Sequence, residues 1–121
     1  PTGRVTVAAP EVTVLDLVET PALGGGLGNV ATVIGDLLHE GAIDVGDLAD
    51  IAASYPSAVA QRAGYLVEHM ADEIGAQIDL DQLEQLLTGA IYTVLDPQQP
   101  RDGEHDRRWH VIRNANIEHD L

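Results

Sequence analysis

Apolar residues recur with the 3.6-residue period of α-helices over most of the chain. A first helix is predicted to begin at Pro10, to place Leu15 and Val18 on its apolar side and to end near Thr20. A second helix is predicted to stop at Gly41, because glycine commonly follows the last helical turn. Its apolar stripe consists of Val30, Val33, Ile34, Leu37 and Leu38.

Two further helices are predicted in the middle of the chain. Asp44 is placed to cap the third, which should end where Pro56 restricts the backbone of Tyr55. The fourth spans residues 55–70 and is amphipathic. Gly64 lies in its interior, and the cost of a mid-helix glycine indicates that another backbone approaches there. The residues predicted on its solvent side are Gln61, Arg62, Glu68, His69, Asp72 and Glu73.

A fifth helix is predicted to be capped by Asp79, with Gln82 three residues later. Ile78 is spaced to pack against Leu83 as a hydrophobic staple. The residues expected to face inward from this helix are Leu80, Leu83, Leu86 and Leu87.

After residue 90 the pattern changes to short runs rich in β-branched and aromatic residues. Residues 91–95 and 109–112 are predicted strands, and residues 5–9 form a further alternating run. The polar segment 96–107 between the later strands is expected to lack regular structure. We therefore predict one α+β domain over residues 1–121, with a layer of about five helices and a small, mainly antiparallel sheet.

Four segments of the chain carry a family resemblance. They are residues 9–18 (APEVTVLDLV), 25–33 (GGLGNVATV), 61–66 (QRAGYL), and 107–114 (RRWHVIRN) followed by Ile117 and Glu118. In this order and spacing the chain resembles the C-terminal domain of the AbiEi family of antitoxins, from type IV toxin–antitoxin systems.

The resemblance implies a regulatory function without catalysis. Members of this family antagonise a nucleotidyltransferase-like toxin, by masking it directly, by acting on its target or by promoting its modification. Larger members add an N-terminal winged-helix domain that binds DNA and makes the protein an autoregulating repressor. Since this chain begins at Pro1, we interpret it as a fragment of such a protein, with DNA binding confined to the missing domain.

The charge of the chain agrees with the assignment of DNA binding to a separate domain. There are 20 Asp and Glu against 6 basic residues, all of them Arg, and the net charge is −14. So acidic a chain repels nucleic acid, because phosphate binding requires clustered cations. The basic cluster at Arg101, Arg107, Arg108 and Arg113 is interleaved with carboxylates and is interpreted as a solvated loop. The acidity fits either a basic protein partner or a need for solubility.

Composition also indicates the cellular location of the protein. The chain has no cysteine, no apolar run of the roughly 20 residues that a membrane span requires, and no signal-peptide pattern at its start. A cytoplasmic protein is the expectation.

No cofactor or metal site is predicted. Residues 26–31 match G-x-G-x-x-A, but a helix rather than a strand is predicted before them, so a helix entry is favoured over a dinucleotide site. His69 and Glu73 are one helical turn apart, yet the His-Glu-x-x-His pattern is missing. The other residues that could bind a metal are His105, His110, Glu118, His119 and Asp120, which are interpreted as solvated. Neither Ser54 nor Ser57 lies in a nucleophile motif, so no catalytic residue is assigned.

Protein interaction is therefore the leading hypothesis. The candidate partner surface comprises Arg62, Tyr65, Trp109 and Arg113, because Arg, Tyr and Trp commonly anchor interfaces. For Arg62 the alternative is an ion pair with Glu68 or Asp16, and for Tyr65 and Trp109 it is core packing. The alternative function is a ligand-sensing or dimerisation domain of a transcription factor without a toxin partner.

Overall fold

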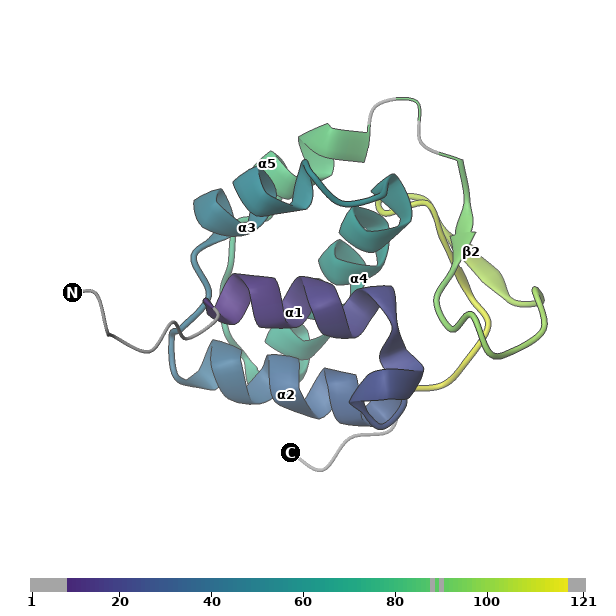
Figure 1. Cartoon of the computed structure of the whole chain (residues 1–121), viewed down its shortest axis with the longest axis horizontal. Helices are drawn as coiled ribbons and strands as arrows, with labels where there is room; N and C mark the ends of the chain where they lie inside the picture. The colour runs from purple at the N-terminus through teal and green to yellow at the C-terminus, as the bar shows by residue number, and fades with distance from the viewer. Residues whose placement is uncertain (1–8, 88, 90, 118–121) are drawn as a thin grey trace, which may run out of the picture.

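The helices form one layer of the molecule. The computed structural model describes residues 9–87, 89 and 91–117, and within them it confirms the α+β class, with five α-helices and a small sheet. The helices are α1 (Pro10–Glu19), α2 (Leu27–His39), α3 (Val45–Ala52), α4 (Ser57–Ile74) and α5 (Asp81–Glu84), with 3-10 helices at Pro21–Gly24 and Gln85–Leu87. Figure 1 shows α1 in front of α4, with α2 below it and α3 above it.

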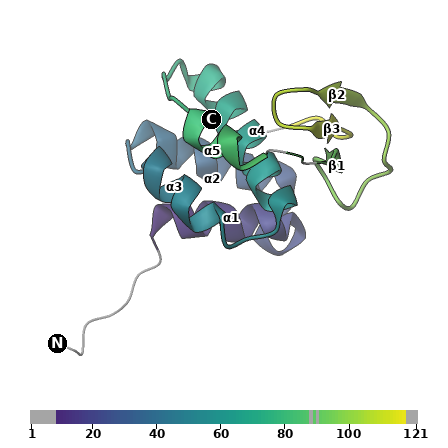
Figure 2. The ribbon, with the colours of Figure 1, turned by 90° about the horizontal axis from the view of Figure 1, so that it is seen from above.

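The sheet is formed by three short strands from the last quarter of the chain. The strands are β1 (Thr93–Val94), β2 (Glu104–Asp106) and β3 (Val111–Arg113), in the order β1-β3-β2. β3 pairs with β1 in parallel and with β2 antiparallel, so the sheet is mixed, and the expected antiparallel pairing holds for β2 and β3 alone. Figure 2 shows the sheet standing to one side of the helical layer.

The polar segment 96–107 differs from its prediction, because it contains β2. Glu104, His105 and Asp106 show no apolar alternation, and this strand forms through backbone pairing with β3 along the open edge of the sheet. The first predicted strand, at residues 5–9, lies outside the described residues except for Ala9.

The predicted boundaries of the first two helices are confirmed and those of the next two are shifted. α1 begins at Pro10 and ends at Glu19, and Gly41 follows α2 in the left-handed conformation with a φ of 68°. The Asp44 carboxylate caps α3 by accepting from the amide of Asp47 at 2.9 Å. α3 nevertheless ends at Ala52, because the chain then closes turns in which Tyr55 N–H donates to the Ala52 carbonyl at 3.0 Å.

α5 is shorter than predicted. Asp79 accepts from the amide of Asp81, only two residues later, at 3.0 Å, so it stabilises a turn before the helix and α5 begins at Asp81. Leu80, Leu83 and Leu87 are buried as expected. The prediction for Leu86 is wrong, because it is 37% exposed. The chain continues beyond α5 as a 3-10 helix, whose tighter winding changes the direction of successive side chains.

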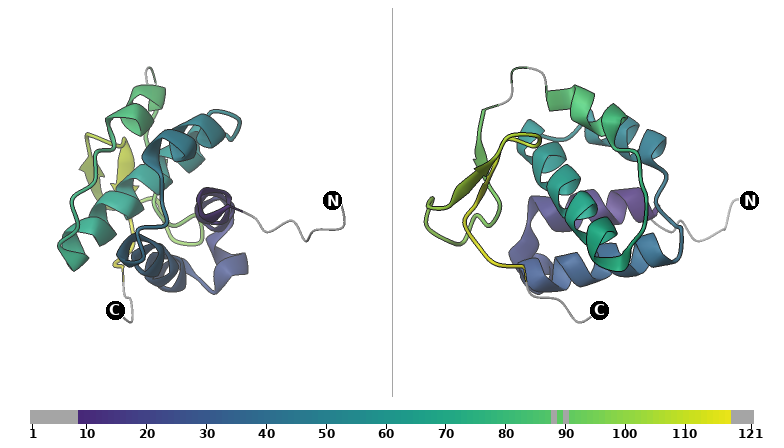
Figure 3. Two further views of the ribbon diagram at one scale, coloured as in Figure 1. Left: turned by 90° about the vertical axis from the view of Figure 1, so that its left-hand side faces the viewer. Right: turned by 180° about the vertical axis from the view of Figure 1, so that it is seen from behind.

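The core lies between α4 and the other helices. Leu66 and Met70 of α4 are fully buried, together with Leu15 of α1 and Ile34 of α2. Figure 3 shows, from behind, α4 running diagonally across the helical layer. α4 therefore has one side in the helical core and another available for the sheet.

Two carboxylates of α1 connect this helix to the rest of the layer. Glu11 is buried and accepts from the amide of Asp44, immediately before α3, at 2.8 Å. Asp16 accepts from the hydroxyl of Tyr55, just before α4, at 2.6 Å. The acidic residues of the first family segment thus have structural roles.

Gly64 is the point of closest approach between α4 and the C-terminal part of the chain. The prediction of a close neighbour is confirmed, but that neighbour is the indole of Trp109 rather than another backbone. A Cβ on Gly64 would overlap three atoms of the indole ring. Trp109 itself is completely buried, so the ring has no open space into which to move.

We expect Gly64→Ala to destabilise the protein by about 1–3 kcal/mol, the usual cost of overpacking. Helix propensity alone predicts the opposite sign, a gain of about 1 kcal/mol. Urea unfolding of the wild type and the variant distinguishes the two. In a Trp109→Leu background the loss should shrink, and an unchanged or increased stability of Gly64→Ala would disprove the contact.

The hydrogen bond to Asp16, followed by the effect of desolvation, raises the pKa of Tyr55 to about 12. Since the ordinary pKa is about 10, the contribution of this bond to stability is complete below pH about 10 and is lost as pH rises through about 12. Tyr55→Phe should flatten this part of the stability profile, by no more than about 1 kcal/mol because the pair is exposed. The tyrosinate absorbance step near pH 12 should disappear as well. Asp16→Asn should move that step toward pH 10, and a wild-type Tyr55 that ionises near pH 10 would contradict the prediction.

Candidate functional site

One side of α4 forms the surface on which the C-terminal sheet is docked. Gln61, Gly64 and Glu68 lie three and four residues apart, so their side chains share one side of the helix. All three contact the segment between residues 91 and 110. This side includes Gln61 and Gly64 of the QRAGYL segment.

Gln61 connects the residues that precede β1 and β3. Its side-chain amide donates to the carbonyl of Ile91 at 2.7 Å and to the carbonyl of His110 at 2.8 Å. These residues lie just before β1 and β3, so the contacts support the parallel pairing of Thr93 with Val111. The prediction that Gln61 faces solvent is wrong, because it is 1% exposed. Its burial is compatible with its polarity because both amide hydrogens are bonded.

Arg62 is partly buried against the open edge of β1. Its Nε donates to the carbonyl of Val94 at 2.8 Å, and an Nη lies 3.4 Å from the hydroxyl of Thr93. Burial lowers the pKa of Arg62, and the charge of Asp96 opposes this effect. The ion pair with Glu68 or Asp16 considered from the sequence is not formed. Arg62 instead blocks a strand edge that would otherwise offer an unpaired carbonyl.

Trp109 and Tyr65 are core residues of this junction. The Trp109 indole N–H donates to Glu68 at 3.0 Å, and its backbone amide donates to Asp106 at 2.9 Å. Tyr65 is buried and stacks on His69 with ring centres 6.1 Å apart. Burial raises the pKa of Tyr65, and the nearby guanidinium of Arg113 opposes the increase. Both aromatic residues therefore pack in the core, which was the alternative to a role at a partner surface.

The four residues of the candidate partner surface therefore meet where α4 contacts the sheet. Arg62, Tyr65 and Trp109 are directed into this junction, whereas the side chain of Arg113 remains 51% exposed. Arg113 also lies 3.8 Å from Glu104 of β2. The four residues predicted from the sequence thus lie close together, but three of them contact the interior of the molecule rather than solvent.

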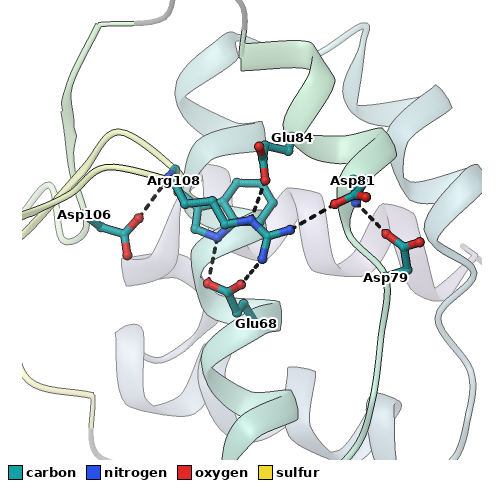
Figure 4. A network of polar contacts seen from close by, with 7 residues as sticks. Glu68, Asp79, Asp81, Glu84, Asp106 and Arg108 are labelled. Atoms are coloured by element: carbon teal, nitrogen blue, oxygen red, sulfur yellow. Dashed lines mark hydrogen bonds and ion pairs between the residues drawn. The ribbon is translucent and has the colours of Figure 1, made fainter.

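Arg108 fastens the turn before β3 to α4 and α5, as Figure 4 shows. Its guanidinium binds Glu68, lies 2.5 Å from Glu84 and 3.4 Å from Asp81, and is 4.9 Å from the centre of the Trp109 ring. Burial tends to lower the pKa of Arg108, but the bond to Glu84 and the charge of Glu68 outweigh it, so the pKa is raised. Arg108 is exposed in a turn, as the solvated-loop interpretation expects, but its guanidinium is also held by carboxylates of α4 and α5.

The G-x-G-x-x-A segment opens α2 and lines an open cleft of about 740 Å³. A 3-10 helix precedes it, not a strand, as the helix-entry interpretation requires. Asp96 is the charged residue of the lining, and a carboxylate disfavours a pyrophosphate. The cleft is lined by Gly25, Leu27, Gly28, Asn29, Thr32, Asp96, Gln99, Asn114, Ala115 and Asn116.

The histidines are engaged in local contacts. His69 lies 3.6 Å from Glu73, while His105 and His110 stack on Tyr92 with ring centres 4.6 and 5.0 Å away. Within the described ranges, no three His, Asp or Glu side chains are placed to share a metal ion. Glu118, His119 and Asp120 lie outside those ranges.

Sequence reasoning missed Gln61, Glu68 and Asn114 as residues that shape this region. The spacing of Gln61, Gly64 and Glu68 was a usable signal, because it puts two polar residues on the same side as a helical glycine. Asn114 was not detectable, since it holds the loop after β1 by exchanging bonds with the backbone of Asp96 at 2.8 Å, eighteen positions away.

The comparisons with known proteins give one match. A family model described as "AbiEi antitoxin C-terminal domain" matches residues 1–69, which is 69 of the 121 residues. No curated protein and no solved structure matches the chain significantly. The matched part contains α1 to α3 and most of α4, including the docking side of α4. No helix in the described part of the chain is both long and apolar enough to cross a bilayer.

Gln61→Leu should cost about 1–3 kcal/mol of stability, because the carbonyls of Ile91 and His110 each lose the hydrogen bond donated by the buried Gln61 amide. Amide hydrogen exchange at Thr93 and Leu95, which donate to the carbonyls of His110 and Ile112, should accelerate more than exchange in α2. The matched control is Gln77→Leu at an exposed position, for which we expect little change. Equal effects of the two substitutions would show that Gln61 does not secure the sheet.

Proposed function

Because the chain belongs to the AbiEi antitoxin C-terminal domain family, we propose that it neutralises a cognate nucleotidyltransferase-like toxin. The family match over α1 to α4 carries this proposal. Membership supports an antitoxin role in a type IV toxin–antitoxin system, and it implies a toxin partner. That the toxin is a nucleotidyltransferase-like protein is our proposal.

In the full-length protein, we assign autoregulation to an N-terminal winged-helix domain that binds the operator. The net charge of −14 supports this division, because a domain of this charge repels DNA at long range. The present chain would then act by protein contact, and the preceding domain by DNA contact. We assign no enzymatic activity to either role.

The helical layer offers a surface suited to a basic toxin. Between residues 5 and 61 the chain has no Lys or Arg, and its exposed carboxylates there belong to Asp16, Glu19, Asp36, Glu40, Asp44, Asp47 and Asp50. Opposite charge would accelerate association with a basic, nucleotide-handling protein. Of the predicted partner residues we retain Arg113 as an exposed contact, while Arg62, Tyr65 and Trp109 serve by holding the sheet in place.

Co-expression with a nucleotidyltransferase-like candidate toxin tests the proposal. We expect the domain to restore growth and to co-elute with the toxin, with and without its N-terminal region. Restored growth without co-elution would make the mechanism indirect. Failure of both the domain and the full protein would contradict the antitoxin function and favour a ligand-sensing or dimerisation domain, for which the open cleft at α2 is the supporting feature.

A charge-reversal variant locates the contact. Asp47→Lys combined with Asp50→Lys changes two exposed carboxylates of α3, and should weaken co-elution most at low salt. Asp102→Lys is the matched control, because Asp102 is exposed but lies in the loop before β2. Equal co-elution of both variants would exclude the acidic helical layer as the contact.

A further inference from the structure

The chain reverses direction at the end of α4. Gly75 follows the helix in the left-handed conformation with a φ of 73°. The next amide, that of Ala76, donates to the Ala71 carbonyl at 2.8 Å and closes the turn. Residues 76–80 then return from the end of α4 to α5, as the view from behind in Figure 3 shows. A groove of about 380 Å³ lies between the last turns of α4 and this returning segment.

The groove has an apolar floor. Ala71 and Leu80 line it and are buried, with exposed fractions of 2% and 1%. Ala76 and Ile78, on the returning segment, line it as well and are only half-buried. Part of their apolar surface is therefore accessible to an occupant of the groove.

Asp72 is the carboxylate that the groove offers to an external group. Glu68 lines the groove too, but it already accepts from the Trp109 indole and binds Arg108. The side chain of Asp72 is exposed, and it forms neither a hydrogen bond nor an ion pair with any described residue. Asp72 thus lies at the rim of an apolar groove without an internal cation.

The charges around the groove are mostly negative. Asp79 and Asp81 are exposed at the start of α5, where the returning segment ends. Arg108 lies near these carboxylates, as Figure 4 shows, but its guanidinium is already bound by Glu68, Asp81 and Glu84. A phosphate or an acidic segment of a protein would be repelled here, whereas a cation would be attracted.

The combination of floor and rim selects the kind of cation. A purely apolar side chain would bury the Asp72 carboxylate without a partner, which is costly. For a metal ion, no three His, Asp or Glu side chains of the described ranges are suitably placed. An arginine fits both parts, because its methylene stem packs on apolar surface while its planar guanidinium pairs with a carboxylate. Arginine is also enriched at protein interfaces, whereas lysine is depleted there.

We propose that this groove binds an arginine side chain of a protein partner. The guanidinium pairs with Asp72, and the methylene stem packs against Ala76 and Ile78. The groove lies on α4 and the segment after it, so it is distinct from the acidic surface of α1 to α3. The inference rests on the proposed function only in naming the toxin as the partner that supplies the arginine.

The test is an NMR titration of the isotope-labelled chain with an acetylated and amidated Leu-Arg-Leu peptide at millimolar concentration. We expect saturable shifts of the amides of Ala71, Asp72, Ala76 and Ile78. The Leu-citrulline-Leu peptide has the same shape without the charge, and it should bind roughly threefold to fivefold more weakly, as expected for the loss of an exposed ion pair. Asp72→Asn should weaken binding of the arginine peptide by a similar factor.

Asp102→Asn is the matched control, because it removes the same charge from an exposed carboxylate that does not line the groove. It should bind the peptide like the wild type. Asp72→Asn should keep the wild-type thermal unfolding curve, since the Asp72 carboxylate holds no described contact. Any of four results would overturn the proposal: no saturable shifts at the groove, equal weakening in both variants, equal binding of the citrulline peptide, or the same shifts with spermidine at the same concentration.

The titration contains no toxin, so its outcome is independent of the co-expression experiment. Absence of binding would remove the groove and leave the antitoxin function standing, and failure of co-expression would leave the groove standing. Co-elution of the toxin should be weaker with Asp72→Asn than with Asp102→Asn. Equal co-elution of these two variants would show that the toxin does not supply the arginine.

Discussion

The insertion of the Trp109 indole against Gly64 is the contact on which the arrangement of the two parts of the molecule depends. Without a side chain at Gly64, the ring reaches the surface of α4 and becomes completely buried. The polar groups around it are then close enough to bond. Glu68 accepts a hydrogen bond from the indole N–H, and the Gln61 side-chain amide donates to the carbonyls of Ile91 and His110. A cluster of polar bonds of this kind is stabilising only when every member is satisfied, and packing of the ring is what places them.

The family segments are explained largely by this architecture. Glu11 and Asp16 connect α1 to the starts of α3 and α4, and Gln61 and Gly64 receive the sheet. Arg108 joins the fourth segment to α4 and α5 through three carboxylates. Within residues 1–69, which the family model matches, the segments that carry the resemblance therefore supply contacts that hold the fold together, whereas Arg108 lies outside the matched residues. Partner recognition must use side chains that these internal contacts leave at the surface.

Local patterns predicted the helical layer well and the sheet less well. The apolar stripe that ends at Gly41 and the cap at Asp44 are decided within a few residues, so they could be found from the sequence. The strand at Glu104–Asp106 could not be found from the sequence, because it is extended through its pairing with residues 111–113 and not through a local pattern. Gln61 was assigned to solvent for a similar reason. Its partners at Ile91 and His110 are 30 and 49 positions away along the chain. Helical periodicity shows that position 61 is polar, but it does not show that distant carbonyls bond to this side chain.

The same reasoning separates the two kinds of arginine in this chain. Arg62 and Arg108 have their guanidiniums occupied by a strand edge and by three carboxylates, so their role is to join the sheet to the helices. Arg107 is adjacent to Arg108 in the sequence but has no described partner. Because neighbouring residues of identical chemistry differ in this way, composition alone could not distinguish a structural arginine from one that faces outward. The distinction comes from the turn before β3, which directs Arg108 toward Glu68 and leaves Arg107 beside an open groove.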